Sequence, residues 1–352
     1  MTSNPIDGFR DAIVASGLTA PDAIEADGKL HRFSSNGKSG DDAGWYVFHI
    51  DGIAAGIFGD WRTGMSETWK ADAGRKPTKQ EAAEQRTKLD ALRRERDAAE
   101  MLGNEQAAKK ATAIWQAEPL ATADHGYLVK KGIQPHGTRV GSDGRLLVPM
   151  RDTAGKLWNI ERIAVEKPAD GSADKKGLYQ GRRTGCYFAI GSPKGAAVLC
   201  IVEGFATGAS IHEATGLPVA VAFNAGNLEP VGKALRKKIP DLPMVICADD
   251  DWKTDGNPGR TKGEAAALAV GGFMVLPVFQ GDRPEKATDF NDLHLAEGMD
   301  AVRNIIMAVV DVLTVKVDAP QSEPVVLPSV NATLGSVLNH AHSVMPYAIE
   351  VE

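Results

Sequence analysis

Between residues 196 and 279, short apolar runs alternate with stretches of helix-favouring composition. The apolar runs are continuous and do not alternate with polar residues, as expected of strands that are buried on both faces of a sheet. The predicted strands are 196–204, 217–224, 242–250 and 273–279, and the predicted helices are 206–216, 228–240 and 259–272. This pattern predicts an α/β domain with a parallel sheet and helices on both faces.

The rest of the chain divides into regions of different composition. Up to residue 72, short alternating runs broken by Gly and Asp predict hairpins in a small β-rich module, which we expect to bind and guide the template. A segment rich in Ala, Glu, Lys and Arg follows, and its capping-box spacing at Thr78 and Glu81 predicts an exposed spacer helix that can break at Gly103-Asn104. Two strands around a turn at 152–156 precede a basic, loop-like stretch. The predicted domains are residues 1–72, 73–116, 117–195, 196–315 and 316–352, the last a Pro-rich linker with a helix.

Charge and cysteine content narrow the classes of function. The net charge is −6 and the pI is about 5.8, so the whole chain has no basic signature, although local patches decide contacts with nucleic acid. The three cysteines have no CxxC spacing, which predicts a reduced protein without a cysteine-based zinc site. The N-terminus lacks the features of a signal peptide, and no apolar run reaches the roughly 18 residues of a membrane span. We therefore expect a cytoplasmic protein with no membrane partner.

Carboxylates gather where the predicted strands end. Glu203 ends the first strand, Asp249, Asp250 and Asp251 end the third, and Asp289 follows the fourth. Because the carboxyl ends of parallel strands share one edge of the sheet, we expect these side chains to converge on a divalent cation. Strand alternation places Asp249 and Asp251 on one side and Asp250 on the other, so the first two are the predicted ligands. The alternative is a solvated turn that caps the next helix.

The order of these motifs resembles the Toprim domain: Glu-Gly after a first strand, Asp-x-Asp after a third, and a later acidic cluster. The stretch "GRLLVPMRDTAGKLWNIERI", followed by "KKGLYQG", is similar to the basic half of the catalytic core of DnaG-type primases. The N-terminal "GWYVFHIDG" and "GDWRTG" are similar to segments at the front of phage and plasmid primases. The resemblance implies a Toprim-type parallel sheet with helices on both faces, preceded by a basic α+β primase subdomain and the small β-rich module.

The resemblance also implies roles for individual residues. Glu203 matches the family's glutamate, proposed to act in acid/base or metal chemistry, and Asp249 and Asp251 match its metal ligands. Asp289 matches the first acid of the last motif, and the implied cofactor is Mg²⁺ or Mn²⁺. The residues implied to contact template or nucleotide phosphate are Arg151, Lys176 and Tyr179.

The chain departs from the family pattern at three points. Asp250 stands where primases commonly have Gly, and Asn291 stands where a second Asp is common. The second departure puts a third metal position in doubt. No Cys/His zinc module precedes the core, so template choice must be made in some other way.

Basic residues interleave with aromatic ones between residues 175 and 187. Lys175, Lys176, Arg182 and Arg183 bracket Tyr179, a combination that suits a single strand because cations follow phosphates and rings stack on bases. The alternative is a solvated loop. We favour contact with DNA because, in the family that the chain resembles, this stretch adjoins the acidic site.

Two features of the N-terminal module have plain structural explanations. Trp45, Trp61 and Trp69 form either a stacking surface for template or the core of a small domain, and we favour the core. The Gly-Lys-Ser at 37–39 lacks the second Gly of a P-loop, because Arg32 stands at that place. We therefore predict no ATPase.

These observations favour a DNA primase that joins nucleoside triphosphates on single-stranded DNA in phage or plasmid replication, with a replicative helicase as a further partner. A Toprim nuclease with the same ions is the second hypothesis. A non-catalytic DNA-binding accessory protein is the third.

Overall fold

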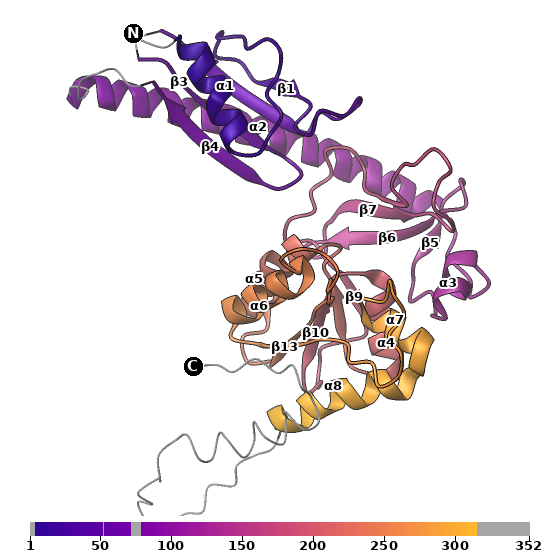
Figure 1. The fold of residues 1–352 in the computed structure, drawn as a ribbon. Helices are drawn as coiled ribbons and strands as arrows, with labels where there is room; N and C mark the ends of the chain where they lie inside the picture. Colours follow the sequence, from indigo (N-terminus) through magenta and orange to yellow (C-terminus); the bar gives the residue numbers. More distant parts are fainter. Residues whose placement is uncertain (1–3, 52, 72–78, 315–352) are drawn as a thin grey trace, which may run out of the picture. The chain divides into compact units, whose positions relative to one another are not determined.

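The computed structural model describes residues 4–51, 53–71 and 79–314. The chain forms two compact units, Met1–Leu102 and Gly103–Glu352, which we describe separately (Figure 1). None of the described helices is both long and apolar enough to cross a membrane.

The first unit is a four-stranded antiparallel sheet covered on both faces. Its order is β1-β2-β3-β4, and α1 packs Phe9 against Phe48 and Phe58 on one face. On the other face, the guanidinium of Arg96 in α2 lies 5.2 Å from the ring of Trp45. Both central strands are therefore buried along their whole length. The elements are α1 (Pro5–Ala15), β1 (His31–Phe33), β2 (Gly44–His49), β3 (Ala55–Asp60) and β4 (Met65–Lys70).

The charged segment forms one helix of 39 residues, α2 (Lys79–Ala117), and the expected break at Gly103-Asn104 is wrong. A Cβ at position 103 would lie 3.0 Å from Gln180, so glycine lets the helix and this side chain approach closely. The prediction of an exposed helix also needs correction, because Ala107, Ala108 and Ala111 are buried. The predicted start at Thr78 lies outside the described residues.

After the end of α2, the second unit continues with a short helix and an antiparallel sheet. The sheet has the order β5-β6-β7-β8, and the predicted strand pair around the turn at 152–156 is confirmed. Asp152 holds that turn by accepting the backbone N–H groups of Ala154 and Lys156. The elements are α3 (Gly126–Lys131), β5 (Arg139–Val140), β6 (Leu146–Arg151), β7 (Leu157–Ile163) and β8 (Lys175–Lys176).

A five-stranded sheet with the order β13-β12-β10-β11-β9 follows. The four strands that come later in the chain are parallel to one another, as predicted. They are β10 (Leu199–Val202), β11 (Val219–Val221), β12 (Met244–Cys247) and β13 (Phe273–Val275). The edge strand β9 (Phe188–Ile190) was not predicted, and it pairs antiparallel with β11.

Helices cover both faces of this sheet, which confirms the predicted α/β architecture. Alternate residues of β10 face opposite cores: Cys200 and Val202 pack toward α4 and α8, and Leu199 and Ile201 pack toward α5 and α6. The first core continues into β6 and β7, so the two sheets of this unit share it. The helices are α4 (Phe205–Thr215), α5 (Leu228–Lys238), α6 (Pro258–Val270), α7 (Phe290–Glu297) and α8 (Met299–Thr314).

Candidate metal and nucleic-acid site

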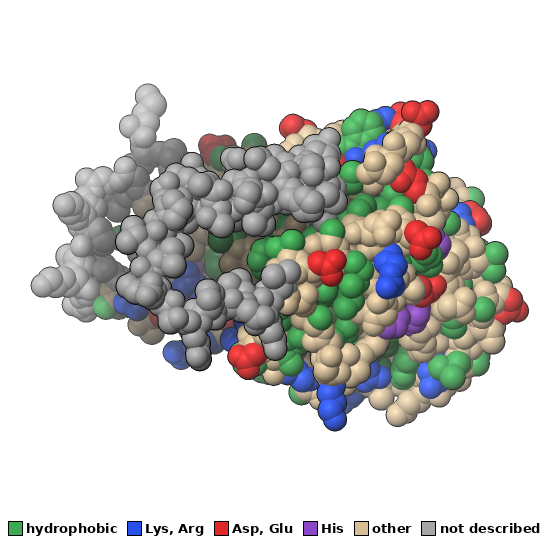
Figure 2. Space-filling model, turned by 90° about the horizontal axis from the view of Figure 1, so that it is seen from below, with side chains coloured by type: hydrophobic (Ala, Val, Ile, Leu, Met, Phe, Trp, Pro, Cys, Tyr) green, Lys and Arg blue, Asp and Glu red, His purple; other side chains and the backbone are tan. Residues whose placement is uncertain are grey.

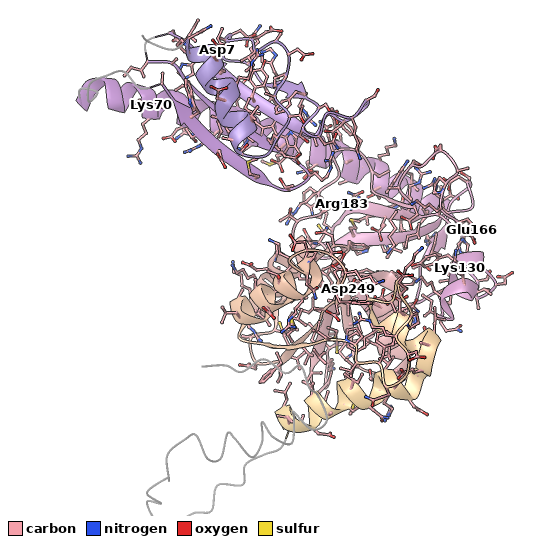
Figure 3. All side chains as sticks on the ribbon, in the orientation of Figure 1. Asp7, Lys70, Lys130, Glu166, Arg183 and Asp249 are labelled. Atoms are coloured by element: carbon pink, nitrogen blue, oxygen red, sulfur yellow. The ribbon has the colours of Figure 1, made fainter. Side chains whose placement is uncertain are left out.

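Four of the predicted acidic residues lie at the carboxyl edge of the parallel sheet. Glu203 directly follows β10, and Asp249 and Asp251 follow its neighbour β12. The two strands pair in register at Val202 and Cys247, so the chain leaves the sheet at the same level in both. Asp289 is the N-cap of α7. Figure 3 shows Asp249 at the edge of this sheet that faces β6 and β7.

Asp249 is in the least favourable environment for a charged carboxylate at this edge. Burial raises its pKa well above the usual value, and the charges of Asp289, Glu203 and Asp251 raise it further. Its Oδ1 atom is buried without a hydrogen-bond partner. An unpaired buried carboxylate oxygen surrounded by like charge is costly, and a cation would relieve both the missing contact and the repulsion.

Glu203 lies in the same electrostatic environment. Burial is the largest cause of its raised pKa, and the charge of Asp251 adds to it. The backbone N–H of Ala225 donates to its carboxylate and acts in the opposite direction. The turn at 224–228, which follows β11, therefore lies at the site.

Asp289 is fixed by the start of α7. It accepts the backbone N–H of Asp292 at 2.8 Å, and the Asp292 carboxylate reaches back to the N–H of Asp289 at 3.4 Å, which makes a capping box. Burial raises the pKa of Asp289, and the charge of Asp292 raises it further. Asn291 is fully buried, and its amide donates to Lys131 and Ser210, so it serves the packing of α7.

The three acids 249–251 follow the end of β12 and have different partners. Asp251 accepts the backbone N–H of Gly259 at 2.9 Å, and a Cβ on Gly259 would lie 2.5 Å from the Asp249 carbonyl. Asp250 instead binds Asn257 Nδ2 at 2.6 Å and Arg283 Nη1 at 2.6 Å. The Asp250 carboxylate therefore stabilises the loop through these two contacts and does not belong to the acidic cluster.

The spacing of the carboxylates bears on how they could hold a cation. Among the described residues, one group offers three ligand atoms that all lie within 4.8 Å of one another, and it lies in the first unit. No three of the described carboxylates at the sheet edge lie as close together as that. Mg²⁺ commonly binds through one or two carboxylates and keeps several waters. The residues therefore fit a partly hydrated divalent cation and do not form a closed protein cage.

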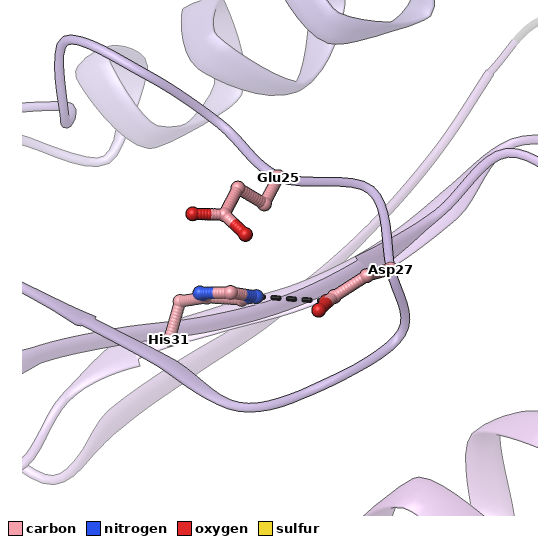
Figure 4. Close-up of side chains that lie close together, drawn as sticks. All are labelled: Glu25, Asp27 and His31. Atoms are coloured by element: carbon pink, nitrogen blue, oxygen red, sulfur yellow. Dashed lines mark hydrogen bonds and ion pairs between the residues drawn. The ribbon is translucent and has the colours of Figure 1, made fainter.

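The group in the first unit is Glu25, Asp27 and His31 (Figure 4). His31 Nε2 lies 2.8 Å from Asp27 Oδ1, and its ring stacks on Tyr46. The hydrogen bond from His31 lowers the pKa of Asp27. Because this pairing accounts for the geometry and both acids are exposed, we assign no metal to it.

Lys175 of β8 faces the acidic cluster. Its Nζ atom lies 3.9 Å from the place that a Cβ on Gly204 would take, next to Glu203. Partial burial acts to lower the pKa of Lys175, but Tyr127, Glu161 and Asp289 outweigh it, so the pKa is raised. The ammonium is therefore held in its charged form at the edge where the carboxylates meet.

The other predicted cations are spread over the antiparallel sheet. Arg183 packs over the backbone of Gly177, and Arg182 lies 5.0 Å from the ring of Trp158. Arg151 lies 6.0 Å from the ring of Trp115, beside a cavity of about 260 Å³. Lys176 and Tyr179 are exposed.

The tryptophans of the first unit belong to its core, as favoured above. Trp45 is 2% exposed, and Trp61 and Trp69 pack against the two clusters of buried side chains. They are not an open stacking surface.

Trp252 and Arg283 were not predicted from the sequence as residues near the site. Trp252 directly follows Asp251 and is exposed, and Arg283 binds Asp250. An indole next to an acidic triplet was the available signal. Elsewhere, the face seen in Figure 2 intersperses acidic, basic and hydrophobic side chains, so no surface of a single charge stands out there.

Comparison with known proteins agrees with this geometry. Residues 198–300 match the Toprim domain family. Two relatives, both DNA primase TraC of Escherichia coli, are 36% identical over 293 residues and 35% identical over 296 residues. Each match covers 78% of this chain, but the chain spans only 26% of the first relative and 20% of the second.

Two solved structures show a weaker likeness. The Aquifex aeolicus primase has a TM-score of 0.39 at 14% identity, with 87% of this chain and 85% of that chain covered. The DnaG catalytic core has a TM-score of 0.40 at 14% identity, with 68% and 91% covered. Both scores are too low to define a common fold.

Proposed function

We propose that this chain, which carries a Toprim domain and is related to DNA primase TraC, is a DnaG-type DNA primase. It would join nucleoside triphosphates on a single-stranded DNA template in phage or plasmid replication. A replicative helicase is a further proposed partner. Because the chain spans about a quarter of its first relative, activity, substrates and partners are proposed for this chain and are not taken over from the whole relative.

The observation that supports the proposal most is the buried, unpaired Oδ1 atom of Asp249 among the charges of Glu203 and Asp289. Folding does not favour such an arrangement by itself. A binding site for a divalent cation gives it a purpose, and the Toprim match supports a site of that kind. We propose Asp249, Asp251, Glu203 and Asp289 as the residues that hold Mg²⁺ or Mn²⁺.

The cation would lower the pKa of an attacking 3′-hydroxyl and neutralise charge on the phosphoryl group. The raised pKa of Glu203 suits it to accept and return a proton at this edge. The Lys175 ammonium is placed to bind phosphate oxygens that approach the carboxylates. Lys176, Tyr179, Arg182, Arg183 and Arg151 are proposed to contact template or nucleotide.

The test uses the full chain with single-stranded DNA, labelled nucleoside triphosphates and Mg²⁺ or Mn²⁺. New labelled oligonucleotides are expected. Shortened DNA would indicate the nuclease instead, and neither product would indicate a non-catalytic DNA-binding protein. Asp249→Asn and Asp251→Asn should each abolish synthesis, because each removes a charge that the cation needs.

The matched control is Asp255→Asn, the same chemical change at an exposed position of the same loop. It should keep the activity of the unaltered chain. Full activity in both Asp249→Asn and Asp251→Asn would show that these carboxylates do not hold the cation.

A further inference from the structure

An exposed indole stands at the rim of the candidate metal site. Trp252 directly follows Asp251, and its side chain is 46% exposed. Its Nε1 atom donates to the carbonyl of Ala287 at 3.3 Å, so the ring is anchored at one edge. Two cations lie close to the ring: Lys253 Nζ at 4.9 Å and the Arg283 guanidinium at 5.2 Å from its centroid.

The middle residue of the acidic triplet holds this arrangement in place. Arg283 donates from Nη1 to the Asp250 carboxylate at 2.6 Å and from Nη2 to the Asp250 carbonyl at 3.0 Å. Its Nε donates to Ala287, the residue that also binds the indole. One guanidinium thus ties together the loop that carries the ligands, the segment at 283–287 and the exposed ring.

A large apolar ring exposed between two cations is informative, because its exposure does not serve the core. Aromatic rings interleaved with cations are what nucleic-acid strands require, since bases stack on rings while cations bind phosphates. Position adds a second argument. Trp252 is adjacent in sequence to Asp251, and the Ala287 carbonyl that anchors its ring lies two residues before Asp289, so the ring is held beside two proposed cation ligands.

We propose that Trp252 is a stacking surface for one nucleobase at the candidate metal site, positioned by Asp250 and Arg283. The inference rests on the proposed function, because it takes the ligand of the site to be a nucleotide or a nucleic-acid strand. The base belongs either to the template strand or to a nucleoside triphosphate, and the test separates the two.

The test compares ligands that differ only in having bases. In one arm, the full chain is titrated in Mg²⁺ with labelled oligothymidylate and with an abasic sugar–phosphate strand of the same length. In the other arm, it is titrated with a nucleoside triphosphate and with inorganic triphosphate. The variants are Trp252→Ala and Trp252→Phe. The control is Phe273→Ala, which removes an aromatic ring of similar exposure, 48%, from the start of β13.

Trp252→Ala should weaken binding of the base-containing ligand by about 5- to 150-fold, the range for one stacked base, and leave its base-free counterpart unchanged. Trp252→Phe keeps a ring face and should retain most of the affinity. A loss for the oligonucleotide assigns the base to the template, and a loss for the nucleoside triphosphate assigns it to the substrate. Phe273→Ala should change neither arm.

Equal losses for ligands with and without bases, or no loss in either arm, would overturn the inference. In the first case Trp252 only supports the loop, and Trp252→Phe decides the matter if Trp252→Ala does not fold. Failure of the unaltered chain to synthesise oligonucleotides would instead count against the proposed function. The comparison of ligands with and without bases would still show whether Trp252 stacks on a base.

Discussion

At the scale of single residues, the candidate site is defined by a carboxylate that folding alone does not favour. Asp249 is half-buried near Glu203 and Asp289, and its buried Oδ1 atom lacks a hydrogen-bond partner. Its pKa is raised, so the folded state binds a proton there more tightly than the unfolded state does. The free energy of unfolding of the metal-free protein therefore falls as pH rises from the usual aspartate range through the raised pKa.

Asp249→Asn should consequently stabilise the metal-free protein. The gain should be near zero at about pH 2, well below the ordinary aspartate pKa of about 3.9, because there the carboxyl is protonated even in the unfolded chain, and it should grow with pH to on the order of 1–3 kcal/mol. Thermal unfolding with a chelator across this pH range measures it.

Excess Mn²⁺ should reverse the order, because only the unaltered chain gains free energy from binding the ion. A variant that is less stable than the unaltered chain at pH 8 without metal would contradict this account.

The sequence was sufficient to place Glu203, Asp249 and Asp251 at one edge of the sheet, because parallel strands end there, and their role as cation ligands stays a prediction. It was not sufficient to predict the orientation of Lys175, which depends on the packing of one sheet against the other. The role of Asp250 was likewise hidden, since its partner Arg283 lies 33 residues further along the chain.

At the scale of elements, two helical glycines occupy opposite environments. In α2, a Cβ on Gly103 would lie 3.0 Å from the far end of the exposed Gln180 side chain, which can move aside, and 3.3 Å from the Gln180 Cβ, which has to shift by only a few tenths of an ångström. In α6, a Cβ on Gly263 would lie 2.5 Å from the Cβ of Ala248 and 3.0 Å from Met274 Sδ. The Ala248 Cβ is fixed to the backbone and cannot move aside.

Gly103→Ala should therefore stabilise the protein by about 0.5–1 kcal/mol, the difference in helix propensity. Gly263→Ala should destabilise it by about 1–3 kcal/mol through overpacking. Urea unfolding midpoints, compared at equal slope, measure both. A loss of stability in Gly103→Ala would mean that Gln180 cannot move aside.

Element prediction succeeded where the pattern was long and failed where it was short or ambiguous. The buried parallel strands gave continuous apolar runs, but β9 has only three residues and lies among Gly and Pro. The helix α8 was not predicted, although its sequence carries a helical pattern: the buried residues Val302, Ile306 and Val310 recur every four residues. The break at Gly103 was wrong because one glycine costs a long helix little.

At the scale of the whole molecule, every proposed cation ligand belongs to the second unit. Residues 103–117 of α2 also contribute their buried alanines to that unit, which has its own two sheets. The assignment of residues 1–72 to template binding remains a prediction, and its tryptophans no longer support it.

A fragment of residues 103–352 should bind Mn²⁺ as the full chain does, within about 0.5 kcal/mol, as expected for independent sites. Electron paramagnetic resonance of free Mn²⁺ measures both affinities, and Asp249→Asn in each chain is the control. A loss of about tenfold or more, 1.4 kcal/mol, would show that the first unit contributes to the site.

The strand order of the parallel sheet also bears on how the protein folds during synthesis. β9 and β10 leave the ribosome first, β11 then pairs with both, β12 adds to the free side of β10, and β13 adds to β12. From β11 onward, each new strand finds at least one neighbour already made. The nascent sheet can therefore grow from the β9 edge towards β13, and after β11 no strand has to wait for a partner that the ribosome has yet to translate.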